Sequence, residues 1–353
     1  MIRARAGRIK RPMKSCDLRI SRGWGPAVRG EPMIGETAMA IGLCLMIEGQ
    51  EGLTWERWRR LARAAEDGGF EALFRSDHLT GLFGDPKRPS LDTWASLTWL
   101  ASNTSRIRFG PLVCPLTLHH PALLAKRAAG VAELSGGRLD LGIGAGWHEG
   151  EHAMFGVPFP PLKERMDRFE CGARAIRALW QGRPVTLEQP YYALRDAESY
   201  PLPPGGRVPL IVGGRGEKRT LPIVAACADE WNITRITLDE YPAKRGVLDA
   251  LCRKAGRDAK AIRGSLMVPY IVGRDARERD ARLTRVRQIF PRVPDTEAAW
   301  RAAGFLYGEP ARLVDELKRW EKVGVARVML QTLDMEDLAA IELLAREVVP
   351  ACR

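Results

Sequence analysis

The chain of 353 residues has no apolar run near the length of a membrane span, about 20 residues, and its beginning shows no apolar signal-peptide core. Its seven cysteines are scattered and form no C-x-x-C pair, which argues against a zinc site and for a reducing compartment. We therefore expect a cytoplasmic protein with no membrane partner and no metal. The chain does have apolar content: 45% of its residues are hydrophobic, enough for a large buried core.

A dinucleotide-binding fingerprint is also missing, although one glycine-rich segment invites that interpretation. Gly142, Gly144 and Gly146 alternate at the end of an apolar strand. The final glycine of G-x-G-x-x-G would fall on Trp147 or Glu149, so the spacing fails. Because glycine weakens a strand, three on one face indicate that something flat or bulky approaches the backbone there.

Acidic residues are scarce at the beginning of the chain. Residues 1–37 hold nine Lys/Arg and three acids, so they carry +6 of the formal net charge of +12. This stretch has no apolar period and is rich in Arg, Gly and Pro, so we predict that residues 1–38 are a disordered tail or sequence upstream of a true start at Met39. A nucleic-acid-binding tail is an alternative of another class, because basic arms bind phosphate backbones. The tail has almost no aromatic interleaving, and no nucleic acid partner is expected.

Apolar strands and amphipathic helices alternate after residue 38. The strand segments are 40–47, 70–75, 107–114, 139–144, 209–212, 230–233, 265–272 and 327–331, and the helical segments are 54–67, 91–103, 121–134, 163–181, 218–227, 238–255, 310–323 and 335–349. Eight strand–helix pairs predict an α/β fold with a parallel sheet, and eight is the number that closes a (β/α)8 TIM barrel. We predict this barrel as one domain over residues 39–353, with insertions at about 149–206 and 274–304.

The five histidines follow the second, third and fourth predicted strands: His78, His119, His120, His148 and His152. The active site of a barrel lies at these carboxyl ends. Asp77 and His78 form either an acid–base pair or a structural hydrogen bond, and the residues alone leave both open. The pair at 119–120 precedes a proline and is typical of a helix-capping turn. The acids between His148 and His152 give a metal-like spacing, but they follow a turn rather than lie in a defined helix, so no metal is expected.

A glycine-rich turn follows the fifth predicted strand at 213–216 and leads into a helix that begins near Lys218 and Arg219. Exposed backbone N–H groups, a helix N-terminus and two cations together favour phosphate. The turn does not match G-x-x-x-x-G-K-[ST], so it is not a nucleoside-triphosphate loop. The competing interpretation is an ordinary turn before a solvated basic helix. We favour phosphate because such sites recur in the second half of barrels.

Several motifs together resemble the luciferase-like monooxygenase superfamily, in particular its coenzyme F420-dependent oxidoreductases. The motifs are Leu45–Trp55, Phe74–His78, Phe109–Val113, His120–Lys126, Leu134–Trp147, Arg165–Glu170, Ile211–Gly214 and Ala228–Asn232. They span nearly the whole barrel and leave out residues 1–38. The resemblance implies a luciferase-like barrel that holds a flavin-like ring at the carboxyl ends of its strands and that commonly pairs as a homodimer.

The resemblance also implies roles for individual residues. It implies that Asp77 and His78 contact the ring. A bulge in the third strand, often with a non-proline cis peptide, pushes against the back of the ring, here at Leu112, Val113 and Cys114. The ring is flanked by Ala145, Gly146, Trp147 and His148, and the phosphate is held by Gly213, Gly214, Gly216 and Arg219. The sugar-phosphate dehydrogenases of this superfamily carry a catalytic glutamate where this chain has Trp147. That sugar chemistry is therefore not expected.

We therefore predict an oxidoreductase that transfers hydride between coenzyme F420 and an unidentified small substrate, apolar or flat. The cofactor carries the redox chemistry, and the protein orients its ring and excludes water. His78 is the candidate proton donor, and Asp77 orients the ring or His78. The alternative within the same fold is a monooxygenase that uses FMN.

Overall fold

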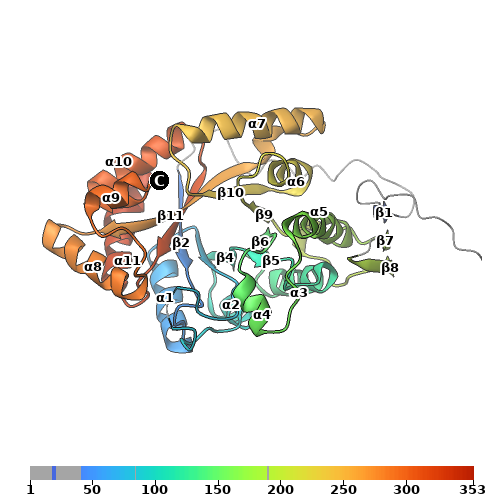
Figure 1. Cartoon of the computed structure of the whole chain (residues 1–353), viewed down its shortest axis with the longest axis horizontal. Coiled ribbons are helices and arrows are strands. Elements are labelled where there is room, and N and C mark those ends of the chain that lie inside the picture. Colours follow the sequence, from blue (N-terminus) through green and yellow to red (C-terminus); the bar gives the residue numbers. More distant parts are fainter. Residues whose placement is uncertain (1–17, 21–40, 84, 189–190) are drawn as a thin grey trace, which may run out of the picture.

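A parallel barrel forms the centre of the molecule (Figure 1). The computed structural model describes residues 18–20, 41–83, 85–188 and 191–353. In hydrogen-bonded order, the wall strands are β4 (Arg108–Pro111), β3 (Ala72–Arg75), β2 (Gly42–Ile47), β13 (Arg327–Thr332), β11 (Arg263–Val272), β10 (Glu230–Thr234), β9 (Leu210–Gly213), β6 (Leu141–Gly144) and β5 (Cys114–Pro115). Because β4 and β5 are two pieces of one strand, these nine described strands give eight wall positions. A bridge from Phe109 to Leu139 joins β4 to β6, so the predicted (β/α)8 barrel is confirmed.

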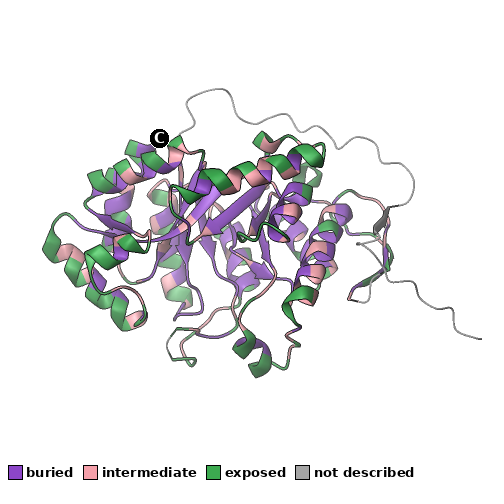
Figure 2. Cartoon of the chain, turned by 45° about the horizontal axis from the view of Figure 1, so that its top comes forward, coloured by how far each residue is buried: buried purple, intermediate pink, exposed green. Residues whose placement is uncertain are grey.

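Helices cover the outside of the wall and turn their exposed faces to solvent, while the strands are buried (Figure 2). They are α1 (Trp55–Asp67), α2 (Thr93–Asn103), α3 (Pro121–Leu134), α5 (Leu162–Leu179), α6 (Thr220–Cys227), α7 (Glu240–Lys254), α10 (Pro310–Lys322) and α11 (Leu338–Leu343), which continues into η3 (Leu344–Val348) and η4 (Pro350–Cys352). Thr54 caps α1 by accepting a hydrogen bond from the Arg57 N–H at 3.3 Å, as its sequence position suggests. Among the described helices, none is both long and apolar enough to cross a bilayer.

The first insertion contains a small antiparallel sheet that the sequence does not predict. After α4 (Glu149–Met154) and α5, β7 (Val185–Glu188) pairs with β8 (Ala193–Ala197), and η1 (Pro204–Gly206) returns the chain to the wall. β1 (Leu18–Ile20) pairs with the other edge of β7. This sheet lies at the end of the molecule away from α8 and α9 (Figure 1). Residues 18–20 of the predicted N-terminal tail are thus described as a strand, and the rest of residues 1–38 lies outside the described residues.

The second insertion is helical, as its charged pattern predicts. It forms α8 (Ala276–Ile289) and α9 (Glu297–Ala302), and β12 (Leu306–Gly308) then pairs with the carboxyl end of β11. A short turn, η2 (Ala259–Ala261), connects α7 to β11.

Buried ion pairs fill the amino ends of the wall strands. Arg327 begins β13, and its side chain is 1% exposed. It reaches three carboxylates that stand at or beside the first residue of a wall strand: Glu71 at 3.1 Å, Asp140 at 3.0 Å and Glu230 at 2.7 Å. Burial acts to lower the pKa of Arg327, but these carboxylates outweigh it and raise the pKa. This end of the barrel is therefore structural, and the polar groups at the other end are the candidates for chemistry.

Candidate active site at the carboxyl ends of the strands

His78 and Glu151 form a hydrogen-bonded pair at the carboxyl ends of the strands. His78 follows β3, and its Nδ1 lies 2.9 Å from Oε1 of Glu151 on α4. The other carboxylate oxygen of Glu151 accepts a hydrogen bond from the Leu79 N–H at 3.0 Å. Burial acts to lower the pKa of His78, but the hydrogen bond and charge of Glu151 outweigh it and raise the pKa. Because Nδ1 faces Glu151, Nε2 is the ring nitrogen available to a substrate.

Glu48 is a second carboxylate near His78, and the sequence analysis misses it. It follows the last residue of β2 and is 8% exposed. It accepts hydrogen bonds from Nε2 of Gln50 at 2.8 Å and from Nε2 of Gln331 on β13. Its negative charge also acts to raise the pKa of His78. The sequence signal that could identify Glu48 is an acidic residue directly after an apolar strand, and a similar strand-end position identifies Asp77.

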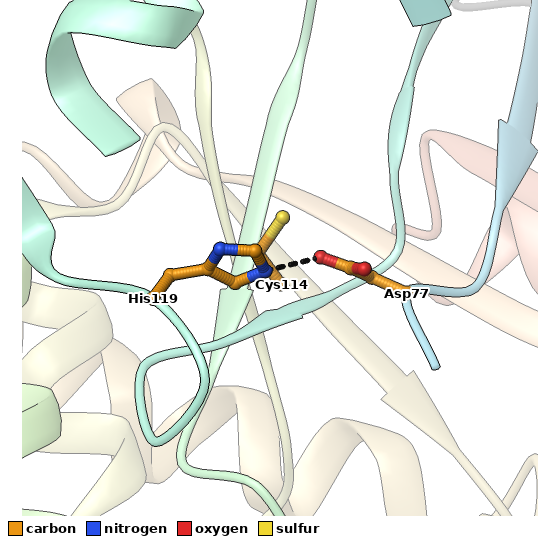
Figure 3. Close-up of side chains that lie close together, drawn as sticks. All are labelled: Asp77, Cys114 and His119. Atoms are coloured by element: carbon orange, nitrogen blue, oxygen red, sulfur yellow. Dashed lines mark hydrogen bonds and ion pairs between the residues drawn. The ribbon is translucent and has the colours of Figure 1, made fainter. Parts of the chain in front are cut away.

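Asp77 faces His119 rather than His78 (Figure 3). Its Oδ2 accepts a hydrogen bond from Nε2 of His119 at 2.7 Å, and the thiol of Cys114 lies beside this pair. Burial acts to raise the pKa of Asp77, but the hydrogen bond and charge of His119 outweigh it and lower the pKa to about 2. The orienting role predicted for Asp77 toward His78 is therefore corrected, because Glu151 holds that ring. A contact between Asp77 and a bound ring stays a prediction.

The predicted turn at 119–120 leads into α3, which begins at Pro121. His120 occupies the N-cap position of α3, but its side chain makes no capping hydrogen bond. Instead, His119 anchors the turn to Asp77.

The alternating glycines of β6 make room for the interrupted third strand. Between β4 and β5 the chain has a cis peptide bond at Leu112–Val113, as the family resemblance implies. A Cβ atom on Gly144 would lie 2.7 Å from Cγ2 of Val113, and one on Gly142 would lie 2.3 Å from the carbonyl oxygen of Pro111. The group that approaches these glycines is the neighbouring strand. The strand fills the space that a side chain on these glycines would occupy, and contact between a ring and this part of the backbone stays a prediction.

Leu112 and Val113 belong to the apolar cluster inside the barrel, and Cys114 does not. Cys114 is fully buried in the larger cluster between wall and helices, so a side-chain contact with a ring inside the barrel does not fit its placement. Leu112 is buried, whereas Val113 is partly exposed. Val113 is therefore the best placed of the three to meet a ring, and ring contact at this strand stays a prediction.

The end of β6 brings an exposed aromatic side chain to His78. Trp147 is 59% exposed, and its ring stands edge-on to that of His78 with centroids 5.7 Å apart. Ala145 and Gly146 precede it and are partly exposed. Gly146 has a φ of 75°, and a Cβ there would lie 2.3 Å from Oγ1 of Thr117, so this turn requires glycine. Their predicted contacts with a cofactor are untested.

The two histidines with metal-like spacing hold α4 in place. His148 caps α4 by accepting a hydrogen bond from the Glu151 N–H at 3.1 Å. His152 is buried, and its ring nitrogens lie 2.7 Å from the carbonyl oxygen of His148 and 2.8 Å from Oγ1 of Thr117. Because α4 also carries Glu151, these contacts position the carboxylate that meets His78. The cofactor contact predicted for His148 remains a prediction.

The glycine turn after β9 stands at the same end of the barrel. Residues 214–218 are exposed, and Gly214 has a φ of 126°, a conformation that favours glycine. The first N–H of α6 donates to the carbonyl oxygen of Gly216 at 2.9 Å. Arg219 pairs with Asp167 on α5 at 2.6 Å, so its charge is shared with a carboxylate. Exposed backbone before a helix start fits an anion. Phosphate binding by Gly213, Gly214, Gly216 and Arg219 stays a prediction.

The fold and these residues define a (β/α)8-barrel enzyme with acid–base groups at the carboxyl ends of its strands. Residues 39–341 match the family model described as luciferase-like monooxygenase, and the chain belongs to that family. It is an oxidoreductase.

Several relatives and solved structures carry F420 in their names. An F420-dependent glucose-6-phosphate dehydrogenase of Beutenbergia cavernae is 38% identical over 160 residues, 44% of this chain and 46% of the relative. An F420-dependent hydroxymycolic acid dehydrogenase of Mycobacterium tuberculosis is 28% identical over 283 residues, 80% of this chain and 71% of the relative. The structure of an F420-dependent secondary alcohol dehydrogenase with an F420–acetone adduct matches with a TM-score of 0.75 at 21% identity, over 89% of this chain and 100% of that chain. At that identity the structural match shows the fold.

The residues at this end of the barrel fit a flat cofactor that carries a phosphate. Val113, Ala145 and Gly213 are partly exposed and small, and a Cβ on Gly213 would crowd Cγ1 of Val113 at 3.3 Å. His78 and Trp147 supply a proton-carrying group and an aromatic wall at the same end. The exposed turn at 214–218 could hold the phosphate of such a cofactor with its backbone N–H groups.

Proposed function

We propose that this protein is a coenzyme F420-dependent oxidoreductase that moves hydride between the cofactor and a small organic substrate. The observation that carries the proposal is His78, held by Glu151 beside the exposed Trp147, at the end of the barrel that also bears the glycine turn. The names of the two relatives and the solved structure support F420 as the cofactor. A deazaflavin has carbon in place of the flavin N5, so when bound it supplies hydride transfer rather than oxygen activation.

His78 is the residue proposed to move a proton. Its Nε2 would donate to a carbonyl oxygen during reduction, or accept from a hydroxyl during oxidation. Glu151 fixes the imidazole through Nδ1 and raises its pKa, which keeps the ring protonated to higher pH. This favours His78 as the acid in reduction of a carbonyl. Glu48 adds negative charge on the same side and supports the protonated ring.

Exposed apolar side chains after β6 support an apolar or flat substrate. They are Trp147 (59% exposed), Met154 (60%), Phe155 (53%) and Leu162 (63%). Trp147 lies beside His78, with ring centroids 5.7 Å apart, and an exposed aromatic side chain at that point suits an apolar or flat ligand. The catalytic glutamate of the sugar-phosphate dehydrogenases is replaced by Trp147, so glucose 6-phosphate is not the proposed substrate despite the name of one relative.

Equilibrium dialysis of the purified full chain against F420 and FMN together tests the proposal. We expect F420 to be retained and FMN to pass freely. Retention of FMN alone would replace the proposal with the FMN monooxygenase. His78→Ala should keep F420 binding and the circular dichroism spectrum but lose turnover, and unchanged turnover would reject the proton-transfer role.

The remaining expectations of the sequence stay predictions. A nucleic-acid-binding tail would give salt-dependent DNA or RNA binding that deletion of residues 1–37 abolishes, and absence of binding at low salt would exclude it. A homodimer and a cytoplasmic location are likewise still to be tested.

A further inference from the structure

Three side chains with metal-binding atoms meet behind the barrel wall. Asp77 follows β3, Cys114 begins β5, and His119 lies in the turn before α3. One carboxylate oxygen, the thiol sulfur and one ring nitrogen all lie within 4.8 Å of one another. Figure 3 shows the three side chains converging from separate segments. Among the described residues, this is the group of His, Cys, Asp and Glu side chains whose donor atoms are close enough for one ion.

The chemistry of these donors selects a borderline-soft divalent cation. Sulfur, imidazole nitrogen and one carboxylate oxygen are the ligand types of Zn²⁺, whereas Mg²⁺ and Ca²⁺ prefer oxygen alone. Zinc needs distances of about 2.0–2.3 Å to such atoms, so donors already within 4.8 Å need only small side-chain movements. We propose that Asp77, Cys114 and His119 form a Zn²⁺ site, with a water molecule as the fourth ligand.

Charge and access both suit this site. The Asp77 carboxylate and a Cys114 thiolate together neutralise the two positive charges, so the occupied site buries no net charge of its own. The His119 side chain is 17% exposed, which gives an ion a route from solvent. Cys114 packs outside the barrel interior.

Zinc binding here is an exchange of protons for metal with no redox change. The Cys114 thiol releases its proton to solvent as the Zn–S bond forms. Nε2 of His119 binds as the neutral ring with its proton on Nδ1, and an imidazolium would release a second proton. The ion would tie the end of β3 to β5 and to the turn before α3. Its proposed role is structural, because it would fix Asp77, the residue that precedes His78.

Cobalt titration tests the site directly, because Co²⁺ replaces Zn²⁺ and a Co²⁺–thiolate bond absorbs in the near ultraviolet. The probe is Co²⁺ alone, added anaerobically to the untagged full chain with Cys16, which lies outside the described residues, replaced by alanine. We expect one Co²⁺ per chain with a thiolate charge-transfer band. Zn²⁺ should erase this band, and Mg²⁺ should leave it. Proton release on Zn²⁺ addition to unbuffered protein should be at least one per ion.

Matched variants separate this site from other ligands. Cys114→Ala and Asp77→Asn should weaken Co²⁺ binding by about tenfold or more, and Cys114→Ala should remove the band altogether. Cys227→Ala is the control, because Cys227 is also buried and its thiol donates to the Ile223 carbonyl at 3.1 Å. It should keep the band. A wild-type chain with a native circular dichroism spectrum and no band overturns the proposal, as does a band that survives in Cys114→Ala.

Discussion

Replacing Gly144 with alanine tests whether the glycines of β6 exist to accommodate the third strand. The new Cβ would lie 2.7 Å from Cγ2 of Val113 and 3.9 Å from its Cβ, so the valine must move. Overpacking an interior in this way costs about 1–3 kcal/mol. We expect Gly144→Ala to lower the free energy of unfolding by that amount, measured by urea titration.

A double-mutant cycle with Val113→Ala identifies the cause. Truncating Val113 removes the atom that the new methyl group meets, so the two substitutions should couple by about 1–2 kcal/mol in the favourable direction. Gly142→Ala should couple more weakly to Val113→Ala, because truncation removes Cγ1 of Val113 at 3.0 Å but leaves the nearer Pro111 carbonyl oxygen at 2.3 Å in place. Gly130→Ala in α3 meets nothing within 4 Å and should stabilise the protein by about 0.5–1 kcal/mol.

Two results would refute this reasoning. One is a Gly144→Ala protein as stable as wild type. The other is a loss of stability that does not change when Val113 is truncated. Either result would mean that contact with the neighbouring strand is not the reason why glycine occupies these positions.

Two further predictions concern charge. Arg327→Met strips the buried carboxylates of Asp140 and Glu230, and the partly exposed carboxylate of Glu71, of a shared cation. It should cost about 3–5 kcal/mol of stability, whereas Arg263→Met, at a side chain that is 36% exposed, should cost about 0–1 kcal/mol. Burial acts to raise the pKa of Asp140, but the charges of Arg327 and Arg108 outweigh it and lower the pKa. The deficit should therefore shrink as pH falls and Asp140 takes up a proton, and a deficit independent of pH would contradict this account. Because Glu151 raises the folded pKa of His78, it contributes stability that is present below the unfolded pKa of His78 and is lost as pH rises through the folded one. Glu151→Gln should remove this contribution and move the limb of kcat/KM assigned to His78 to lower pH, and an unmoved limb would argue against the pairing.

The barrel could be predicted because its signals are local. Each wall strand is an apolar run, and each is followed by a helix with its own start and stop, such as Pro121 and Leu134 at the two ends of α3. The interruption at Leu112–Val113 leaves no mark in composition, because the residues on both sides are apolar. Only the resemblance to a family indicates it. The β7–β8 hairpin is missed because its strands are short and carry polar residues, so they give no apolar run.

The site was only partly predictable, because its pairs are distant in sequence. His78 is recognisable as a histidine after a strand, but its partner Glu151 lies 73 residues away on a short helix within an insertion. Asp77 and His119 are 42 residues apart, and both follow strands that only the closed wall brings together. The sequence therefore identifies such residues by their position at the end of a predicted strand. It does not identify their hydrogen-bond partners, because the tertiary fold brings those together.

Fluorescence titration of F420 against the wild-type chain and Gly214→Val tests the central claim most directly. The wild type should bind one F420 per chain, and excess FMN should not displace it. Gly214→Val places a side chain at a φ of 126° in the proposed phosphate turn and should weaken binding by about tenfold or more, the loss of one or two charge-assisted hydrogen bonds. Gly130→Ala should bind as wild type does. Folded wild-type protein that does not bind F420, or equal affinity in Gly214→Val, would contradict the account.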